Sequence, residues 1–409
     1  MSREFTIPDV YQSKIIRPVK QKSQILDPRK KKLDPVLLDF GPVRFYIPRH
    51  FGFCYGVENA IDIAYRTVEN NPGKRIFLLS EMIHNPMVNN DLRNRGVEFL
   101  FNTDGTERIP LSSLTPDDIV IVPAFGTSIE VQQQIEQQGV DPYQYDTTCP
   151  FVVKVWKRGQ QLGKKGYSLV IHGKHEHEET RATFSHTSMD APCVIVRNPE
   201  EARILADIIT GKRDSSDFER LFRKKSSDGF DPFRDLRHFG VINQTTMLAT
   251  ETQEVMSILK SAVDELNKGG DPSHDFADTA DTLCYATNEN QFATYALMKQ
   301  PADLALVIGG YNSSNTKHLV ELLEQAFPTY HISDANQIIS HARIRHFDQW
   351  KNKVLETPDW LPSENTPVTI ALSSGASCPD TLVDEVILKV IGLFNDCYDL
   401  ETVLAPFKE

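Results

Sequence analysis

Three cysteines that each open a similar stretch of sequence constrain the fold of this chain more than any other feature. They lie in the segments Gly-Phe-Cys54-Tyr, Thr-Thr-Cys149-Pro and Thr-Leu-Cys284-Tyr. After each cysteine come an amphipathic run with helical spacing, a short apolar run and a polar loop rich in His, Asn or Ser. Sequence similarity that recurs at a nearly fixed interval indicates repeated structural units. We therefore predict three related units, each with one cysteine at its start.

Each unit contains two short apolar runs, and both runs end in small-polar loops. Runs of this length between turn residues are typical of buried parallel strands, and the helical runs between them indicate an α/β sheet. In such sheets ligands bind beside the carboxyl ends of the strands. We predict an α/β protein of three pseudo-equivalent lobes, in a trefoil arrangement, whose polar loops face one central pocket. The expected strands are 43–47 ahead of the first cysteine, then 76–79, 119–122, 169–171, 239–242, 304–308 and 368–372.

The cysteines also divide the 409 residues into expected domains. Residues 1–43 form an N-terminal extension rich in Lys and Arg, which we expect to pack on the surface or on a second subunit. Two segments, 211–238 and 347–366, are expected as surface or dimer-forming insertions. The predicted lobes are 44–148, 149–283 with the first insertion, and 284–409 with the second insertion and a C-terminal tail.

The composition argues against several classes of function. A net charge of −12 at pH 7 makes a nucleic-acid partner unfavourable. No apolar run approaches the roughly 20 residues that span a bilayer, and the N-terminus has no secretory signature. We expect a reduced cytoplasmic compartment, or the stromal equivalent if the protein is plastid-derived. The remaining cysteines, Cys193, Cys378 and Cys397, are expected to be buried apolar side chains.

Three thiolates with one open position suit either a zinc ion or a [4Fe–4S] cluster. Structural zinc usually takes closely spaced pairs of cysteines, and ferredoxins also use closely spaced cysteines. The three cysteines here are far apart in the sequence, which favours an interior cluster over zinc. A cluster with three protein ligands leaves one iron free to act as a Lewis acid toward a hydroxyl group. Chance cysteines in three copies of a common unit are the remaining alternative, but they leave the matched positions unexplained.

The polar loops contain many short neutral hydrogen-bond donors and no Gly-rich phosphate cradle with its lysine. Such a set suits a small, multiply charged oxyanion, for which diphosphate is the natural candidate. Any one Ser or Thr among them, taken alone, is better explained as a helix cap. The donors are His84, His177, Thr245, Thr246, Ser313, Ser314, Asn315 and Ser377.

The segment His177-Glu178-Glu179 supplies a candidate proton donor. A carboxyl group beside a dry cluster has its charged form penalised, so it can hold a proton near neutral pH. We expect Glu178 to be exposed. Basic residues on and after the Cys149 helix form either an ordinary solvated face or a docking face for an acidic electron donor. They are Lys154, Lys157, Arg158, Lys164 and Lys165.

Taken together, these motifs resemble the LytB/IspH family of 4-hydroxy-3-methylbut-2-enyl diphosphate reductases, in its plant and cyanobacterial branch. The resemblance covers residues 44–395. It is carried by Gly-Phe-Cys-x-Gly-Val at 52–57, His84-Asn85, Asp-x-Thr-Cys-Pro at 146–150, His-x-Glu at 177–179, Gln244-Thr245-Thr246, the Cys-Tyr-Ala-Thr of 284–287, Asn-Ser-Ser-Asn at 312–315 and Gly-Ala-Ser at 375–377.

The resemblance implies three lobes around a [4Fe–4S] cluster held by Cys54, Cys149 and Cys284, with the substrate hydroxyl on the fourth iron. Glu179 would deliver protons and Thr245 would order the relay. Two electrons from a ferredoxin-like donor would remove the hydroxyl as water, giving isopentenyl and dimethylallyl diphosphate in the last step of the non-mevalonate pathway. A homodimer is possible. The diphosphate clamp would comprise His84, His177, Thr246, Ser313, Ser314, Asn315 and Ser377.

One departure from the bacterial family pattern concerns the clamp. A histidine of that pattern is replaced here by Phe125, which cannot donate a hydrogen bond to phosphate. The pair His175-Glu176 also fits the His-Glu motif of the family locally. The matching Thr183 downstream favours His177 and Glu179 as the motif residues. Two other functions stay open from the sequence: a hydro-lyase of the aconitase type, which needs no net electrons, and a non-enzymatic three-domain metal-binding or electron-transfer protein.

Overall fold

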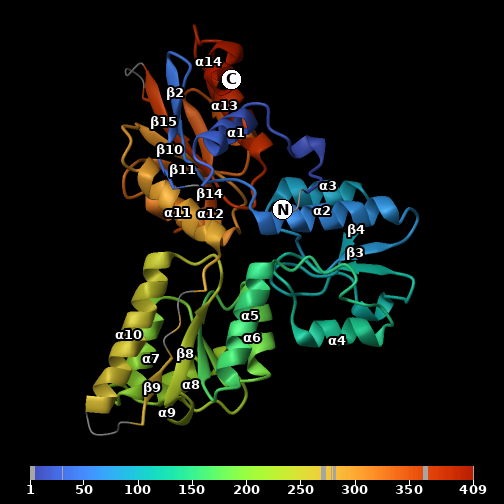
Figure 1. Cartoon of the computed structure of the whole chain (residues 1–409), viewed down its shortest axis with the longest axis vertical. Coiled ribbons are helices and arrows are strands. Elements are labelled where there is room, and N and C mark those ends of the chain that lie inside the picture. The colour runs from blue at the N-terminus through green and yellow to red at the C-terminus, as the bar shows by residue number, and fades with distance from the viewer. Residues whose placement is uncertain are drawn as a thin grey trace. The chain divides into compact units, whose positions relative to one another are not determined.

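The structure is a computed structural model that describes residues 5–29, 31–268, 273–277, 279, 282–362 and 367–408 (Figure 1). Its contacts separate two compact units, and each is described by itself. The first unit comprises Met1–Glu58, Ile83–Asn90 and Tyr285–Glu409. The second unit comprises Asn59–Met82 and Asp91–Cys284. The divisions fall within α2 (Tyr55–Asn70) and α3 (Pro86–Asn94).

The first unit is built on a five-stranded sheet in which all neighbouring strands except one pair are parallel. The exception is β1, which is antiparallel to β2. Successive residues of β10 face opposite sides: Leu304, Leu306 and Ile308 pack on one side, whereas Ala305 and Val307 pack on the other. The strand order is β1 (Val36–Asp39), β2 (Val43–Ile47), β15 (Val368–Ser374), β10 (Leu304–Ile308) and β11 (Thr329–Ile332).

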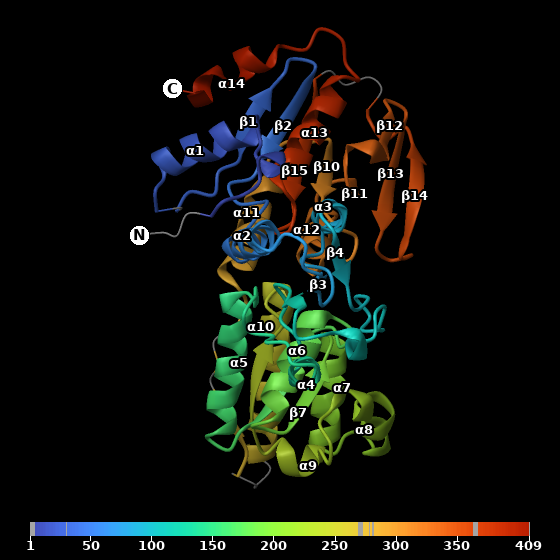
Figure 2. The same cartoon turned by 90° about the vertical axis from the view of Figure 1, so that its right-hand side faces the viewer.

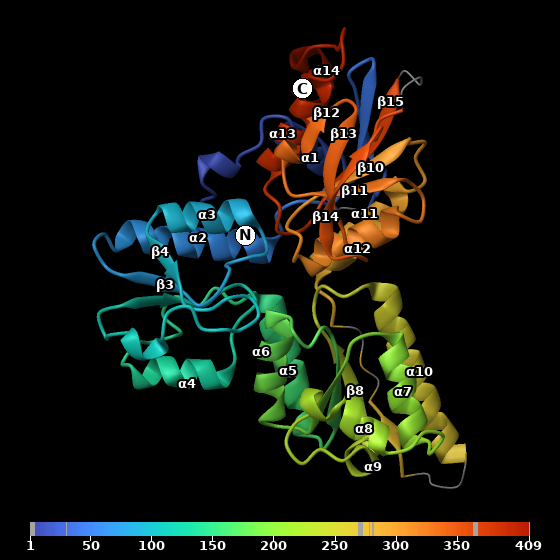
Figure 3. The ribbon, with the colours of Figure 1, turned by 180° about the vertical axis from the view of Figure 1, so that it is seen from behind.

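Helices cover both faces of this sheet, as the alternation of buried residues requires. One face packs against α11 and α12, which lie beside β10 in Figure 3. The other face packs against α1, α13 and α14. The bounds are α1 (Ile16–Leu26), α11 (Tyr285–Leu297), α12 (Ser314–Leu323), α13 (Asp380–Ile391) and α14 (Leu400–Lys408).

The described part of the N-terminal extension is integral to the first unit. Ile16 and Val19 of α1, together with Leu38 of β1, are buried in the same apolar cluster as the central strands. This is closer integration than the surface arm expected from the composition. The extension contributes both a strand and a helix to the core.

A small antiparallel sheet, seen in Figure 2, completes the first unit. It consists of β12 (Ile338–Ser340), β13 (Arg343–Asp348) and β14 (Lys353–Pro358). This sheet accounts for most of the expected insertion at 347–366, of which residues 363–366 lie outside the described part. Trp350 is 82% exposed, but Trp360 is 3% exposed and donates its indole N–H to the Ser340 carbonyl at 3.0 Å. Only one of the two tryptophans is therefore a surface residue.

The second unit contains two sheets, both entirely parallel among their described strands. Helices α7 and α10 pack on one face of the larger sheet, and α5 and α6 pack on the other. The smaller sheet has the order β4 (Val97–Phe99), β3 (Ile76–Leu78), β5 (Ile119–Ile121), and the larger has β7 (Cys193–Val196), β6 (Ser168–His172), β8 (His238–Asn243), β9 (Asp275–Phe276). The other helices are α4 (Ile129–Gln137), α5 (Pro150–Gly163), α6 (Glu178–Ser188), α7 (Pro199–Ile209), α8 (Ser216–Leu221), α9 (Pro232–Asp235) and α10 (Ala249–Lys268).

The insertion at 211–238 is not the surface excursion that its charge suggested. Phe218, Phe222 and Phe230 are buried, and the ring of Phe218 stacks on both others with centroids 5.6 Å apart. These rings belong to the apolar cluster between α7, α10 and the sheet. Several of its charged residues pair with one another, as Arg223 does with Glu219. The insertion therefore adds to the core with one face and to the surface with the other.

The predicted α/β class and the parallel pairing of strands are confirmed, and the structure adds which strands are neighbours. In each of three sheets the two strands expected from one cysteine unit are hydrogen-bonded parallel neighbours: β3 with β5, β6 with β8, and β10 with β15. The loops after paired strands therefore leave from the same edge of their sheet. The lobe boundaries themselves stay a prediction. No helix within the described ranges is long and apolar enough to cross a membrane.

Candidate active site

Each of the three repeated cysteines stands immediately before a helix. Cys149 is the N-cap of α5, and Cys54 and Cys284 directly precede α2 and α11. All three are partly exposed. Cys193 and Cys378 are buried, as expected for apolar side chains, but Cys397 is partly exposed, so the expectation of burial is wrong for it. Burial raises the pKa of Cys193 to about 12, so that thiol is inert. The dipole of a helix N-terminus favours thiolate, which is the form that binds iron.

The three cysteines are divided between the two units. Cys54 belongs to the first unit, and Cys149 and Cys284 belong to the second. Among the described residues of either unit taken alone, no group of three or more His, Cys, Asp or Glu side chains could hold a metal ion. The convergence of the three thiolates therefore stays a prediction, while their accessibility and helix-start positions fit the ligand role.

Glu179, Thr245 and Cys284 of the second unit form a hydrogen-bonded group, and the charge of Glu179 also acts on the Cys149 thiol. The Glu179 carboxyl, 1% exposed, accepts the Thr245 backbone N–H at 2.5 Å and its hydroxyl at 3.0 Å. The Thr245 carbonyl in turn accepts the Cys284 N–H at 3.1 Å. Burial raises the pKa of the Cys149 thiol, and the nearby Glu179 carboxylate raises it further. A buried carboxyl group thus lies beside one candidate cluster ligand and is tied to the loop that holds the other.

The exposure of Glu176 and the burial of Glu179 support His177 and Glu179 as the motif residues, and the burial of Glu178 corrects an expectation. Glu176 is exposed, whereas Glu179 is buried and bonded to Thr245, which supports the His177 and Glu179 register. Glu178, expected at the surface, is only 7% exposed. The first turn of α6 is enclosed, so the helical position of Glu178 does not bring it to solvent.

His177 is oriented by its own backbone. As the N-cap of α6, its Nδ1 atom accepts the Glu179 N–H at 3.2 Å. In the neutral imidazole the proton must then be on Nε2, which becomes a donor. The Phe125 ring meets His177 edge to face, with centroids 5.6 Å apart and planes at 84°. Phe125 thus packs against a histidine that is predicted to bind the diphosphate. Thr246 accepts from the Gln244 amide at 2.8 Å.

In the first unit, the loop between β10 and α12 presents hydrogen-bond donors. The Ser313 hydroxyl oxygen accepts from the Thr316 N–H at 3.2 Å and from the Thr316 hydroxyl at 2.9 Å. The Asn315 carbonyl oxygen accepts the Ala376 N–H at 2.9 Å. Because these acceptor atoms are occupied, the Ser313 hydroxyl proton and the Asn315 amide protons are available to donate.

Two of these groups are buried without a partner among the described residues. The Ser314 hydroxyl and the Asn315 amide nitrogen make no hydrogen bond, although their side chains are only 3% and 4% exposed. A buried polar atom without a partner costs about 1–3 kcal/mol. Such a cost is recovered if a ligand oxygen occupies the space, so this loop fits an anionic substrate group.

Glycines let three loops of the first unit approach one another closely. A Cβ atom on Gly310 would lie 2.3 Å from the His84 carbonyl, and one on Gly375 would lie 2.0 Å from the Thr316 hydroxyl. The Ser377 hydroxyl donates to the same His84 carbonyl at 3.2 Å. The loops carrying His84, Ser313 and Ser377 therefore interlock, and any side chain at either glycine would force them apart.

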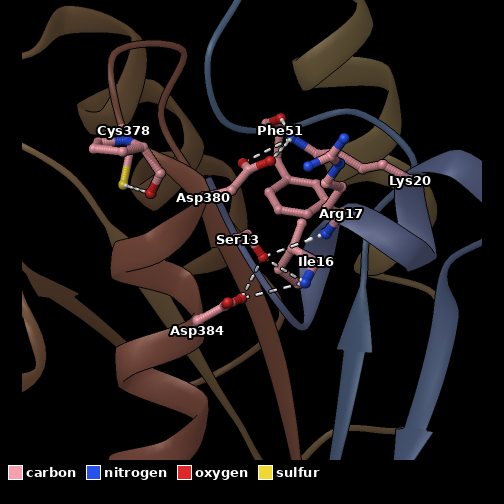
Figure 4. Close-up of polar contacts among 9 residues, drawn as sticks. Ser13, Ile16, Arg17, Lys20, Phe51, Cys378, Asp380 and Asp384 are labelled. Atoms are coloured by element: carbon pink, nitrogen blue, oxygen red, sulfur yellow. Dashed lines mark hydrogen bonds and ion pairs between the residues drawn. The ribbon is translucent and has the colours of Figure 1, made fainter. Parts of the chain in front are cut away.

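The N-terminal extension holds the loop that carries Cys54 (Figure 4). The Lys20 ammonium lies 2.8 Å from both Asp380 oxygens and donates to the Phe51 carbonyl at 2.9 Å. A Cβ on Gly52, whose φ is +73°, would lie 2.2 Å from the Asp380 carboxylate. The Cys54 N–H donates to the Ala376 carbonyl at 3.3 Å.

A second carboxylate anchors the start of α1. The Asp384 oxygens accept the Ser13 hydroxyl at 2.6 Å, as Figure 4 shows. They also accept the Lys14 N–H at 2.6 Å. The sequence did not identify Lys20, Asp380 or Asp384 as residues near the site. No local signal marks them, because their partners lie at the opposite end of the chain.

Comparison with known proteins identifies the family. The family model described as "LytB protein" matches residues 46–391. A 4-hydroxy-3-methylbut-2-enyl diphosphate reductase of Thermosynechococcus vestitus is 42% identical over 354 residues, covering 86% of this chain and 85% of the relative. The enzyme of the same name from Microcystis aeruginosa is 40% identical over 357 residues, covering 86% and 85%.

Solved structures support the fold. A structure described as the E-1-hydroxy-2-methyl-but-2-enyl-4-diphosphate reductase from Plasmodium falciparum aligns with a TM-score of 0.58 at 22% identity, over 83% of this chain and 85% of that one. A second, described as (E)-4-hydroxy-3-methyl-but-2-enyl diphosphate reductase, aligns with a TM-score of 0.50 at 23% identity, over 84% and 97%. With a family match that spans most of its length and relatives at 42% and 40% identity, this chain belongs to the LytB family.

Proposed function

We propose that this protein is a 4-hydroxy-3-methylbut-2-enyl diphosphate reductase of the non-mevalonate isoprenoid pathway. The reaction consumes two electrons and two protons. The allylic C–O bond breaks, its oxygen leaves as water, and a new C–H bond gives isopentenyl or dimethylallyl diphosphate. The relatives named above carry this activity in their names. The observation that carries the proposal is the buried Glu179 carboxyl, held by Thr245 beside Cys149.

The cofactor of this reaction is proposed as a [4Fe–4S] cluster held by Cys54, Cys149 and Cys284. When bound, such a cluster supplies single electrons and an open iron that acts as a Lewis acid toward the hydroxyl. The support from this chain is the matched position of the three cysteines before α2, α5 and α11 and their partial exposure. Zinc would fit the same three thiolates but supplies no electrons.

Proton delivery is proposed for Glu179, with Thr245 as its orienting partner. The Thr245 backbone N–H bonds one carboxyl oxygen, and the Thr245 hydroxyl bonds the other. The hydroxyl can donate to the carboxylate or accept from the carboxylic acid, so Thr245 accommodates both protonation states. A carboxyl group held in this way can transfer a proton without rotating out of its site.

Diphosphate binding is proposed for the donors of both units. His84, Ser313, Ser314, Asn315 and Ser377 are all less than 10% exposed, and the last four are short neutral side chains. Charge-assisted hydrogen bonds to phosphate oxygens are stronger than neutral ones, so a few fixed donors suffice. From the second unit, His177 offers its Nε2–H and Thr246 its hydroxyl.

The electron donor is proposed as a small acidic protein of the ferredoxin type. Helix α5 begins directly after Cys149 and carries Lys154, Lys157 and Arg158 but no acidic residue. Lys154 and Lys157 are exposed, as are Lys164 and Lys165 just beyond the helix. In a chain with a net charge of −12, this basic face offers complementary charge to an acidic partner.

The test is an anaerobic assay of protein with its metal retained. About four irons and no zinc per chain, with a broad visible absorption band, are expected for one cluster. Oxidation of a reduced dye is expected only when the hydroxylated allylic diphosphate is added, with isopentenyl and dimethylallyl diphosphate as products. Water loss without dye oxidation would indicate a hydro-lyase instead. Substrate-independent dye oxidation without product would indicate an electron-transfer protein.

A further inference from the structure

His84 and Asn312 make a direct side-chain contact that the proposed mechanism does not use. The Nδ1 atom of His84 and the Nδ2 atom of Asn312 lie 3.1 Å apart. His84 is 5% exposed, whereas Asn312 lies at the exposed edge of its loop. The two residues are 228 positions apart in the sequence, so the contact depends on the interlocked loops described above.

This contact determines which ring nitrogen carries the proton. An amide nitrogen only donates hydrogen bonds, so the Nδ1 atom that faces it must accept. A neutral imidazole has one N–H group, and with Nδ1 as acceptor that group is at Nε2. A phosphate oxygen accepts hydrogen bonds from an N–H but is repelled by a nitrogen lone pair. The neutral His84 ring therefore donates from Nε2 to diphosphate only in the tautomer that Asn312 selects.

His177 reaches the same tautomer by a different route. Its Nδ1 atom accepts the backbone N–H of Glu179, as the N-cap of α6. A backbone N–H group fixes the tautomer of His177, whereas the tautomer of His84 depends on the side chain of Asn312, which a mutation can remove. Together with the occupied acceptors of Ser313 and Asn315, the contact leaves only donors for the ligand.

We infer that Asn312 is a positioning residue that holds His84 as its Nε2–H tautomer, so that the clamp offers donors alone to the diphosphate of the substrate. The inference rests on the proposed function of the site. Asn312 acts through His84. Asn312 therefore contributes to diphosphate affinity only in a protein that has the His84 imidazole.

A double-mutant cycle measures this dependence. The dissociation constant of inorganic diphosphate is measured by calorimetry on the oxidised, anaerobically prepared holoenzyme and on the variants H84A, N312A and H84A/N312A. H84A is expected to weaken binding about 10–100-fold, as for a lost hydrogen bond to a charged group, and N312A about 3–10-fold. In the H84A background, N312A is expected to change binding by less than about 2-fold. An equal effect of N312A in both backgrounds would overturn the inference.

A matched control and a second readout separate tautomer selection from general damage. Asn336, also exposed, is replaced by alanine in N336A and is expected to leave binding unchanged. Nitrogen-15 spectra of the His84 imidazole are expected to show a bare Nδ1 in the natural protein and a protonated Nδ1 in N312D, whose carboxylate accepts from it. A protonated Nδ1 in the natural protein refutes the assignment. Failure of the natural holoenzyme to bind diphosphate would instead refute the proposed function.

Discussion

At the scale of single residues, the candidate site depends on groups whose protonation or orientation is fixed by a neighbour. Thr245 holds Glu179 from two sides, and Thr316 and Ala376 occupy the acceptors of Ser313 and Asn315. Each neighbour turns an ambiguous polar group into one with a defined role. For this reason the residue types in the sequence do not by themselves specify the site.

Replacing Glu179 by Gln is expected to reduce turnover about 10²–10⁴-fold, the usual contribution of a positioned proton donor. The amide keeps the shape and one acceptor oxygen, so iron content and substrate affinity should change little. Turnover is measured with a reduced dye under anaerobic conditions. Glu176→Gln, at an exposed position three residues earlier in the chain, is the control. Near-normal turnover in the Glu179 variant would remove it from this role.

The pH dependence of stability is expected to include a contribution from His331. Burial lowers the pKa of His331 to about 4, and Lys317 and His346 lower it further, although its bond to the Gly309 carbonyl opposes this. The unfolded chain binds the proton near pH 6.5, so the folded state loses stability as the pH falls from about 6.5 to about 4. The loss is on the order of 3 kcal/mol, from about 1.4 kcal/mol per pKa unit.

Comparison with His331→Gln isolates this contribution from the titrating carboxylates. The free energy of unfolding is measured between pH 4 and 7.5 for both proteins. The natural protein should lose more stability than the variant over this range, because glutamine does not titrate. Parallel curves would show that His331 is protonated in the folded state as readily as in the unfolded chain.

At the scale of elements, the N-terminal extension acts as a brace for the Cys54 loop. Lys20 of α1 joins Phe51, three residues before the cysteine, to Asp380 at the start of α13. The ion pair is partly buried, with side-chain exposures of 30% and 19%. Since Ser377 precedes α13, one lysine ties a proposed cluster ligand to a proposed substrate ligand.

Replacing Lys20 by Met is expected to speed oxygen-driven cluster loss by on the order of 10-fold, as for a lost outer-shell contact. The decay of visible absorbance and the iron content after a fixed oxygen exposure are measured. Lys14→Met, an exposed lysine just before α1, should behave like the natural protein. Equal cluster lifetimes in the two variants would contradict the bracing role.

The aromatic face of the charged insertion is expected to stabilise the second unit. Phe222→Ala removes a ring that is 0% exposed and should cost about 3–5 kcal/mol. Phe233→Ala, in the same insertion but 48% exposed, should cost less than about 0.5 kcal/mol. Chemical denaturation of both variants checks this. An equal loss of unfolding free energy in the two variants would mean that the insertion folds independently of the core.

At the scale of the whole molecule, charge is distributed unevenly. The chain has a net charge of −12, yet α5 and the turn after it are basic. Ferredoxin-driven turnover is therefore expected to fall more steeply with added salt than dye-driven turnover, since salt screens docking between charged surfaces. The charge reversal K154E/K157E should remove most of the difference. Equal salt sensitivity of the two assays would place electron entry elsewhere.

The sequence by itself determined the α/β class, the approximate positions of the strands and the cysteines at helix starts. These features repeat within short windows, where apolar spacing and turn residues fix local structure. It also singled out Glu179 and the donor loops as candidates, because these polar residues follow predicted strand ends, where ligands bind in α/β sheets.

Only the tertiary structure decided how those residues are held. The pairing of β2 with β15, the Lys20–Asp380 ion pair and the His84–Asn312 contact join segments hundreds of positions apart. The burial of Glu178, Trp360 and the insertion phenylalanines likewise contradicts their local polarity or context. Such contacts arise when packing brings distant surfaces together, and no local pattern of residues encodes them.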